Sequence, residues 1–302
     1  MQNNQIQSQM PPKMLAPIIL FVYNRPWHTQ QTVEALQKNE LATESDLFIF
    51  ADGPKTDASE ECLDKIKKVR QYIHTIDGFK SITIKESILN IGLDTSIIRG
   101  VSQILLHYKY AIVLEDDIVT HNMFLNYMND CLVEYHDYQN IYMISGFSCN
   151  INIPSCYRKY MYLIHRPSSW GWGIWNDRWE KIEWDKSKYS FKNFTQRQKN
   201  LFCRGGNDLF RMFSFFYEKD IMPWDLRFAY TMYNNNALCI YPRYSFVNNI
   251  GFDSSGEHCG YMDTKVFTAP SPESYNTSDL PKRLFFNPFV EYRYRQFLKK
   301  HQ

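Results

Sequence analysis

The sequence predicts an α/β protein with a mostly parallel sheet that is covered by helices. Short apolar runs alternate with segments of helical spacing over the first third of the chain. Four strands are expected, at residues 17–23, 47–50, 82–84 and 110–114. Such alternation is typical of parallel sheets, because a crossover helix has to return the chain before the next strand. A run that is apolar throughout fits a strand buried on both faces.

The intervening helices follow from periodicity and turn residues. A first helix is expected over residues 29–36, after the turn at residues 24–26. Asp57, with Glu60 three residues later, has the spacing of a capping box for a second helix. The apolar stripe of that helix consists of Leu63, Ile66, Val69 and Ile73. A third helix is marked by Ile97, Val101, Ile104 and Tyr108.

The second half predicts a smaller mixed region. Helices are expected over residues 124–135, 197–217 and 228–233, and strands over residues 141–144, 160–164 and 241–245. Residues 168–175 read Ser-Ser-Trp-Gly-Trp-Gly-Ile-Trp. Glycines between indoles let backbone and rings approach a ligand closely, and a packed aromatic turn is the structural alternative. Residues 253–260 are polar and contain glycine, which predicts a mobile loop.

Both ends of the chain differ from its middle. We expect a flexible tail over residues 1–14, a domain over residues 15–260 and a C-terminal extension over residues 261–302. Residues 289–300 mix Tyr and Phe with Arg and Lys. They fit a helix docked on its own domain, or one that lies on an anionic membrane surface.

Composition excludes several classes of protein. A net charge of +2 gives no general case for nucleic acid as a partner. Seven scattered cysteines without a CxxC pair indicate a reducing compartment. The polar start lacks the regions of a signal peptide, and no apolar run approaches the ~20 residues of a membrane span. A cytoplasmic protein is therefore expected, with peripheral contact at the inner face of the membrane as an option.

Three carboxylates, Glu115, Asp116 and Asp117, follow the fourth apolar run directly. The carboxyl ends of strands are where open α/β sheets bind ligands. Three adjacent anions repel one another, and Mg2+ or Mn2+ prefers carboxylate oxygens, often together with phosphate. An acidic strand end solvated in a loop is the alternative. There is no GxGxxG and no Gly-rich loop ending in Lys-Ser/Thr, which excludes a dinucleotide fingerprint and a P-loop.

In their order and spacing, these motifs resemble the glycosyltransferases of the GT-A fold. Residues 21–26 resemble the first strand and turn of such enzymes, and Asp52-Gly53 resembles their nucleotide-contacting acid. Residues 90–93 resemble the N-x-G-L turn that packs near the nucleotide. Residues 115–117 resemble the metal-binding DxD element in its E-D-D form.

Further motifs narrow this resemblance. Ser145-Gly146, the Gly-Trp-Gly turn and Trp224-Asp225 are similar to the inverting N-acetylglucosaminyltransferase I group, and the chain also resembles bacterial sugar transferases of the family 2 type. The resemblance covers roughly residues 15–260 and implies a nucleotide-binding half (15–120) and an acceptor-binding half (121–260).

The resemblance implies a metal-dependent, inverting transfer from a UDP-sugar to a glycan or lipid-linked acceptor in bacterial surface polysaccharide synthesis, with N-acetylglucosamine as the favoured sugar. It implies Asp117 as the ligand of Mn2+ or Mg2+, with His258 as a further candidate, and Asp225 as the catalytic base. The residues expected to contact the nucleotide sugar are Tyr23, Arg25, Asp52, Asn90, Gly92, Leu93, Glu115, Asp116, Trp170, Gly171 and Trp172.

Each of these roles has a structural alternative. Asp225 suits the cap of a helix, Asp52-Gly53 is a common turn pair, and Arg25 suits a surface ion pair. Two other functions also remain open. A sugar nucleotidyltransferase usually carries a Gly-rich basic loop after its first strand, where this chain has Asn24-Arg25-Pro26. A non-catalytic carbohydrate-binding protein would need neither Asp117 nor Asp225.

Overall fold

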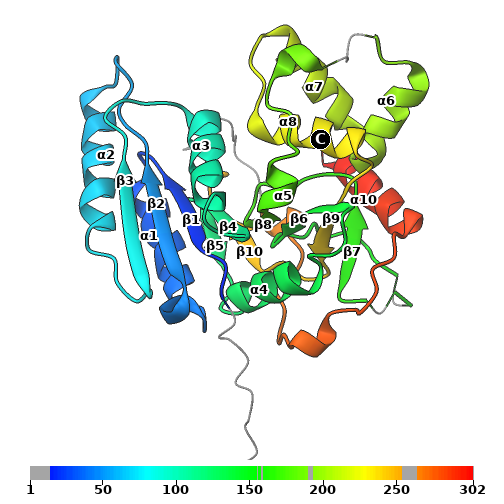
Figure 1. Ribbon diagram of the computed structural model, residues 1–302, viewed down its shortest axis with the longest axis horizontal. Helices are drawn as coiled ribbons and strands as arrows, with labels where there is room; N and C mark the ends of the chain where they lie inside the picture. The colour runs from blue at the N-terminus through cyan, green and yellow to red at the C-terminus, as the bar shows by residue number, and fades with distance from the viewer. Residues whose placement is uncertain (1–13, 155, 158, 190–192, 254–263, 302) are drawn as a thin grey trace, which may run out of the picture.

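The computed structural model describes residues 14–154, 156–157, 159–189, 193–253 and 264–301. It is an α/β fold around an eight-stranded sheet of order β3-β2-β1-β4-β8-β6-β9-β7 (Figure 1). The first half contributes β1 (Ile18–Val22), β2 (Asp46–Ala51), β3 (Ser81–Glu86) and β4 (Tyr110–Glu115). These strands are parallel, with Ile18 beside both Leu47 and Ile112. The predicted fold class is confirmed.

Three helices connect the parallel strands: α1 (Pro26–Gln37), α2 (Glu60–Ile73) and α3 (Leu93–Leu105). The chain winds outward from β1 to β3 and then returns past β1 to form β4. Because crossovers are right-handed, α1 and α2 cover one face of the sheet and α3 covers the other. On the α3 face, a Cβ at Gly100 would lie 2.8 Å from the Phe21 ring.

The second half is mixed, as expected. The strand β8 (Trp172–Trp175) lies antiparallel between β4 and β6 (Ile141–Ser145), and β9 (Leu238–Pro242) lies parallel to β6. The edge strand β7 (Met161–Ile164) is antiparallel to β9. A second, two-stranded sheet pairs β5 (Ile118–Thr120) with β10 (Val247–Asn249).

The helices of the second half lie around this mixed part of the sheet. They are α4 (Phe124–Glu134), α5 (Asn176–Trp179), α6 (Gln196–Phe202), α7 (Asp208–Glu218), α8 (Trp224–Asn234), α9 (Thr264–Phe267) and α10 (Pro288–Lys300). Helices α6, α7 and α8 gather at one end of the molecule (Figure 1), around an aromatic-rich core of their own. No helix in the described part of the chain is both long and apolar enough to cross a membrane.

Two helix starts differ from the prediction. Helix α1 begins at Pro26 rather than at residue 29, because proline lacks a backbone N–H and fits the first helical position. The predicted cap of α2 at Asp57 is wrong. Ser59 is the N-cap, since its side chain accepts a hydrogen bond from the backbone N–H of Cys62.

Two further segments are corrected. The single helix expected over residues 197–217 is divided into α6 and α7. The chain turns between them at Gly205 and Gly206, and Gly206 has φ +154°. The aromatic turn expected at residues 168–175 ends in strand β8, and Trp172 is fully buried there. The strand expected over residues 241–245 is β9, which ends at Pro242.

The C-terminal segment packs on the same core as the rest of the chain. Val290, Tyr294 and Leu298 are buried on the inner face of α10. Buried Glu291 accepts hydrogen bonds from the backbone N–H and the ring Nδ1 of His165, at 2.9 and 2.8 Å. Of the two arrangements open from the sequence, the helix therefore docks on its own domain through this inner face.

Candidate functional site

The sheet reverses its winding direction between β1 and β4, which makes this the topological switch point of the fold. In open α/β sheets, ligands bind in the crevice outside the carboxyl ends of the strands at such a point. Arg25 follows β1, and Glu115 to Asp117 span the end of β4. Because Phe21 and Glu115 are paired in register, these two segments meet in space.

Arg25 forms ion pairs with two of the acids. Its guanidinium Nη2 contacts Asp116 Oδ1, and its Nη1 lies 3.0 Å from Asp117 Oδ2. Burial alone would lower the pKa of Arg25, but the two neighbouring carboxylates outweigh it and leave that pKa above its ordinary value. Thr32 of α1 donates a hydrogen bond of 2.8 Å to the carbonyl of Asp116. Arg25 is thus part of the acidic site and not a surface ion pair.

Three carboxylates follow one another at this site, and Arg25 pairs with two of them. Burial is the main cause that raises the pKa of Glu115 well above 4.5, and the charges of Asp117 and Asp116 raise it further. Burial also raises the pKa of Asp116, against the opposing effect of Arg25. A second cation would therefore find a favourable potential beside these carboxylates.

The backbone after β10 closes over Asp117. The N–H of Ile250 donates a hydrogen bond of 2.9 Å to the carbonyl of Asp117. A Cβ built on Gly251 would lie 2.1 Å from Asp117 Oδ2 and 2.9 Å from Arg25 Nη1. Since real Cβ atoms do not approach so closely, only glycine leaves space for both charged groups at this position.

Asp225 lies in the first turn of α8, next to Trp224, whose ring stacks on Trp172 of β8. The charge of Asp225 raises the pKa of Glu115, after burial and the charges of Asp117 and Asp116. Burial raises the pKa of Asp225 above its ordinary 3.8. The Oδ1 atom of Asp94, at the start of α3, accepts a hydrogen bond of 2.9 Å from the backbone N–H of Trp224. Asp225 Oδ1 also accepts a hydrogen bond of 2.9 Å, from the backbone N–H of Leu226, so both carboxylates supply acceptors at the start of α8.

Asp52 organises a turn. Its carboxylate accepts hydrogen bonds from the backbone N–H groups of Gly53, Ile91 and Gly92, at 2.8 to 3.3 Å. The side chain of Asn90 donates to the carbonyl of Gly53 at 3.0 Å. Gly92 has φ +79°, a conformation that favours glycine, and Leu93 then begins α3. Asp52 therefore has the structural role of a turn residue that was the alternative to a contact with the nucleotide.

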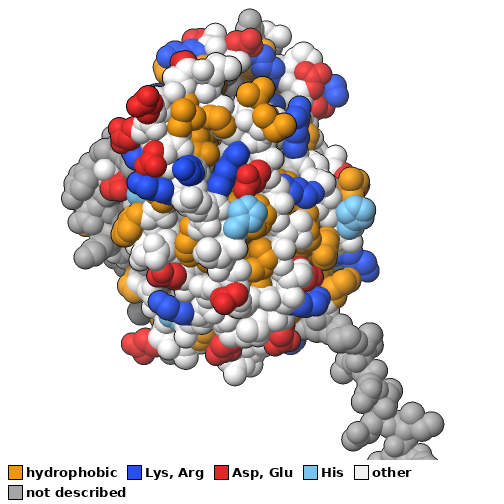
Figure 2. Space-filling view, turned by 90° about the vertical axis from the view of Figure 1, so that its left-hand side faces the viewer, with side chains coloured by type: hydrophobic (Ala, Val, Ile, Leu, Met, Phe, Trp, Pro, Cys, Tyr) orange, Lys and Arg blue, Asp and Glu red, His pale blue; other side chains and the backbone are white. Residues whose placement is uncertain are grey.

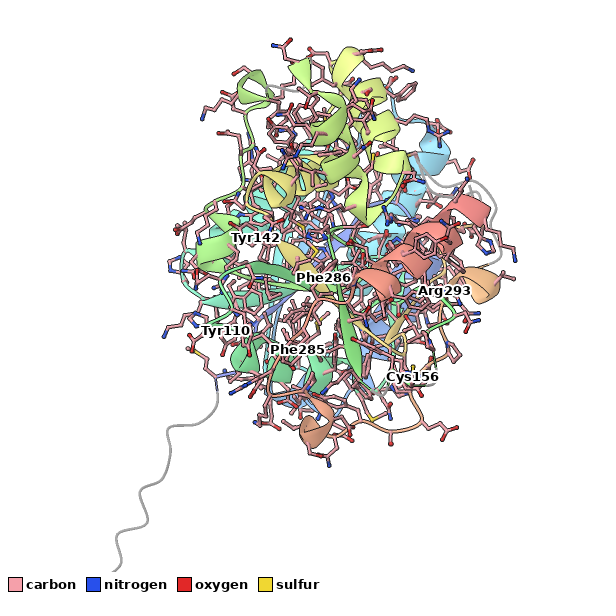
Figure 3. All side chains as sticks on the ribbon, turned by 90° about the vertical axis from the view of Figure 1, so that its right-hand side faces the viewer. Tyr110, Tyr142, Cys156, Phe285, Phe286 and Arg293 are labelled. Carbon is pink, nitrogen blue, oxygen red and sulfur yellow. The ribbon has the colours of Figure 1, made fainter. Side chains whose placement is uncertain are left out.

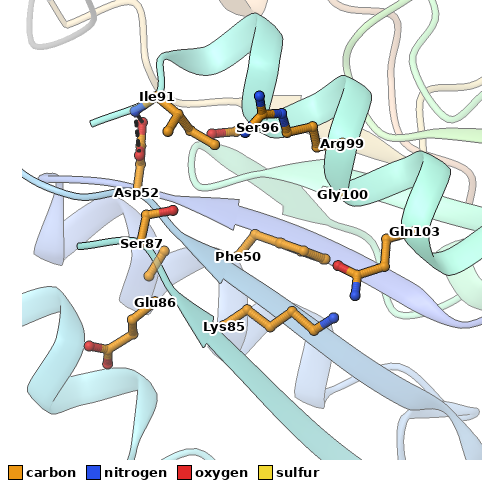
Figure 4. Close-up of a pocket in the computed structure, with 11 residues that line it drawn as sticks. Phe50, Asp52, Lys85, Glu86, Ser87, Ile91, Ser96, Arg99, Gly100 and Gln103 are labelled. Atoms are coloured by element: carbon orange, nitrogen blue, oxygen red, sulfur yellow. Dashed lines mark hydrogen bonds between the residues drawn. The ribbon is translucent and has the colours of Figure 1, made fainter. Parts of the chain in front are cut away.

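A pocket of about 210 Å³ lies beside Asp52, between the ends of β2 and β3 and the first turns of α3 (Figure 4). The Phe50 ring forms part of its wall, and the hydroxyl-bearing residues Ser87 and Ser96 line it as well. Lys85 lies 5.5 Å from the centre of the Phe50 ring. A flat ring with polar groups at its margin would fit this pocket.

The two indoles expected to stack on sugar have different environments. Trp172 is fully buried, with its ring stacked on Trp224 at 5.0 Å, so it has no accessible face for a ligand. This expectation is corrected, since a strand position buried on both sides places the indole in the core. Trp170 is half-buried and contacts Phe147 and Phe252 at 4.4 and 5.4 Å. Gly171 has φ +58° and turns the chain into β8.

Tyr23 and His258 are the two remaining residues that the sequence analysis assigned to the site. Tyr23 is half-buried at the end of β1, with its hydroxyl 3.8 Å from Cys62 Sγ. His258 lies outside the described residues. Within the described ranges, no group of three or more His, Cys, Asp or Glu side chains is arranged to hold a metal ion.

Sequence reasoning missed Asp94 and Gly251 as site residues. Asp94 directly follows the 90–93 turn at the start of a helix, and its position alone does not reveal a bond to α8. Gly251 lies two residues after β10, and its sequence position does not reveal the contact with Asp117. His28 was also missed; its Nε2 atom lies 3.1 Å from Asp253 Oδ2 beside the acidic site.

No family model matches the chain, and neither does any curated protein. Several solved structures are similar to it. One is the mannosyltransferase PcManGT from Pyrobaculum calidifontis in complex with GDP-Man and Mn2+, with 11% identity and a TM-score of 0.34 over 54% of this chain and 48% of that one.

Two others are the structures of S. aureus TarS 1-349 and of the galactosyltransferase LgtC in complex with donor and acceptor sugar analogs. TarS 1-349 shows 12% identity and a TM-score of 0.40, over 85% of this chain and 60% of that one. LgtC shows 11% identity and a TM-score of 0.37, over 73% and 70%. Identities of 11–12% and TM-scores of 0.34–0.40 carry no inference about the activity of this chain.

Proposed function

We propose that this protein is a metal-dependent, inverting glycosyltransferase that uses a UDP-sugar. The observation that carries the proposal is the meeting of Arg25 with Asp116 and Asp117 at the switch point of the sheet. Acids beside a cation at this edge suit a diphosphate with its counter-ion, and a separate, half-buried carboxylate, Asp225, suits proton transfer.

The donor would bind across the carboxyl ends of β1, β2 and β4. Its base and ribose would lie near Tyr23, Asp52 and the turn of Asn90, Gly92 and Leu93, where the pocket beside Phe50 offers a ring surface. Arg25 would contact the diphosphate as well as the acids, because its guanidinium has five donors in a planar fork. Glu115 and Asp116 would meet ribose or a metal-bound water.

The residues present fit a divalent cation. Their hard carboxylate oxygens are suitable ligands, and Arg25 is the cation that already pairs with both Asp116 and Asp117. Asp117 would hold Mn2+ or Mg2+, and the described carboxylates would need phosphate and water to complete the coordination. When bound, the ion would stabilise negative charge on the diphosphate leaving group.

Asp225 would take the proton of the acceptor hydroxyl. Its raised pKa brings it nearer to neutral pH, which makes it a better base than an ordinary aspartate while it remains ionised. The hydrogen bond from Trp224 to Asp94 fixes the start of α8 and therefore the position of Asp225. Trp170, half-buried beside Phe252, is the indole available to stack on a sugar ring.

The acceptor would be a glycan or a lipid-linked saccharide in bacterial surface polysaccharide synthesis, at the cytoplasmic face of the membrane. N-acetylglucosamine is the first donor sugar to test.

The test is UDP release from a panel of UDP-sugars with Mn2+, Mg2+ or EDTA. We expect release from one sugar to require metal, to be lost in Asp117→Ala and to fall about 10²- to 10⁴-fold in Asp225→Asn, the range for loss of a general base. Exposed Asp57→Ala is the matched control and should behave as wild type. Calorimetry with UDP-sugar separates binding from turnover.

Each outcome decides between the candidate functions. Silence across the panel without nucleotide binding would overturn the proposal and favour a carbohydrate-binding protein. Formation of a UDP-sugar from UTP and a sugar phosphate would favour a nucleotidyltransferase. Sugar transfer that survives in Asp225→Asn at the wild-type rate would overturn the role of Asp225 alone.

A further inference from the structure

The outward side of α10 and the segment before it expose four aromatic residues. Phe285 is 66% exposed, Phe289 48%, Tyr292 47% and Phe286 39%. Figure 3 shows Phe285 and Phe286 close to the start of α10. Large aromatic side chains usually lie in a core, so four of them exposed within one short segment indicate a surface that contacts something apolar.

The helix cannot bury these rings by rotating. Its inner face already places Val290, Tyr294 and Leu298 in the core, and Glu291 is held by His165. Residues three and four apart share one face of a helix, so Phe289, Tyr292 and Arg293 all lie on the opposite face. They stay outward as long as α10 is docked.

The exposed charged residues of the same segment are basic, and one of them, Lys282, pairs with Glu134 at 3.6 Å. Lys282, Arg283, Arg293, Lys299 and Lys300 are all exposed. Residues 281–301 contain six Lys or Arg and one acid, the buried Glu291, which is an excess of five positive charges. Since the whole chain has a net charge of +2, the other residues carry an excess of three negative charges. Positive charge is therefore concentrated in this segment.

The face over α2 is different. Acidic and basic side chains lie next to one another there (Figure 2), and Lys65 and Lys68 pair with Glu61 and Asp64 on the same helix. A surface on which acidic and basic side chains alternate in this way is well hydrated and is typical of a face exposed to water. The segment around α10 thus differs in composition from the face over α2.

We propose that the α10 surface, defined as the exposed aromatic and basic residues of 282–300, binds an anionic lipid bilayer. Aromatic rings favour the headgroup boundary, where their apolar body is buried at shallow depth. Lys and Arg around them are attracted to anionic headgroups. A membrane fits better than a protein groove, because several rings and basic side chains are exposed over residues 282–300 and no acid of this segment is exposed. This inference is independent of the sugar-transfer proposal.

The test is cosedimentation of the full chain with vesicles of phosphatidylcholine alone, or of phosphatidylcholine mixed with phosphatidylglycerol. We expect binding to the anionic vesicles only, weakened by salt. Arg293→Gln/Lys299→Gln/Lys300→Gln should weaken binding on the order of a hundredfold, at about fivefold per charge. Phe285→Ser/Phe289→Ser should also weaken it, because shallow burial of the rings is lost.

Matched controls remove the same groups from other surfaces. Lys38→Gln/Lys67→Gln/Lys109→Gln removes three exposed charges elsewhere, and Leu106→Ser removes a side chain that is 79% exposed just after α3. Both controls should bind as wild type does. Wild-type thermal midpoints in all variants would establish that each is folded.

A fluorescence measurement gives an independent readout. Phe285→Trp should be quenched by brominated lipid in anionic vesicles, whereas Leu106→Trp should not. No binding to anionic vesicles, equal binding to neutral ones, or equal loss in the control variants would overturn the proposal.

Discussion

Asp94 Oδ1 accepts a 2.9 Å hydrogen bond from the backbone N–H of Trp224. This bond joins the first turn of α3, in the parallel half, to the first turn of α8, in the mixed half. Trp224 is buried and stacks on Trp172, and its neighbour in the chain is Asp225, the proposed base. The two halves of the chain are thus joined beside the proposed base by one carboxylate that does not itself belong to the acidic triplet.

The first prediction concerns this bond. Asp94→Ala should lower the free energy of unfolding by about 1 kcal/mol, the usual effect of losing a helix cap. It should also reduce sugar transfer more than that loss explains, because Asp225 is no longer held in place. Asp94→Asn keeps an oxygen acceptor and should retain most of the activity. Equal rates for Asp94→Ala and wild type would contradict the positioning role.

Gly251→Ala should weaken binding of Mn2+ and of the nucleotide sugar. The added methyl group would lie 2.1 Å from Asp117 Oδ2, so the carboxylate or the 250–251 backbone has to move. Calorimetric titration with Mn2+ measures the change. Gly78→Ala is a suitable reference for backbone strain, because Gly78 has φ +79°. A Cβ at Gly78 would lie 3.8 Å from its nearest neighbour, the Gln37 side chain, so it would meet no clash. Unchanged Mn2+ affinity in Gly251→Ala would argue against Asp117 as a ligand.

Glu115→Gln should stabilise the protein at neutral pH while it impairs transfer. The pKa of Glu115 is raised by burial, so the folded state keeps a proton that the unfolded state loses near pH 4.5. The contribution of Glu115 to the free energy of unfolding is therefore fully present below pH 4.5. It is lost as the pH rises toward the pKa that Glu115 has in the folded protein.

Urea unfolding at several pH values between acid and neutral is the measurement for Glu115→Gln. The variant should gain about 1 kcal/mol over wild type at neutral pH, a usual size for a single substitution. The gain should shrink toward acid pH. A difference between the two proteins that does not vary with pH would exclude the titration of Glu115 as its cause.

Arg25→Met should destabilise the protein by about 3–5 kcal/mol at neutral pH, because it leaves Asp116 and Asp117 buried without their cation. The loss should become smaller at acid pH and on addition of Mn2+, since protonation or a bound ion replaces the missing charge. Arg99→Met is the control. Arg99 forms no ion pair with any residue that the structure describes, so its change should stay within about 0.5 kcal/mol.

Ser59→Ala and Asp57→Ala test the start of α2. Ser59→Ala should lower the free energy of unfolding by about 1 kcal/mol, because the backbone N–H of Cys62 loses its acceptor. Asp57→Ala should have almost no effect, since Asp57 is exposed and lies before the helix. Denaturant titration of both variants is the measurement. If Asp57 were the cap, Asp57→Ala would lose more stability than Ser59→Ala.

The sequence by itself determined the class of fold and the place of the acidic motif. Apolar runs that end in polar turns, at residues 17–23 and 110–114, predict buried parallel strands whose carboxyl ends share an edge. That signal is local, because alternation and burial are already visible in neighbouring residues. The meeting of Arg25 with Asp116 and Asp117 depends in addition on the pairing of β4 with β1, which the order of these runs along the chain does not give.

Tertiary structure decided which of the candidate side chains meet the site. Trp170 and Trp172 are two residues apart, yet one is half-buried beside Phe252 and the other is fully buried against Trp224. Their separation depends on β8 lying between β4 and β6, which is a pairing between distant segments. The bond from Asp94 to α8 and the approach of Gly251 to Asp117 depend on such contacts too. Local sequence carries no record of them, because they arise only when the sheet brings remote parts of the chain together.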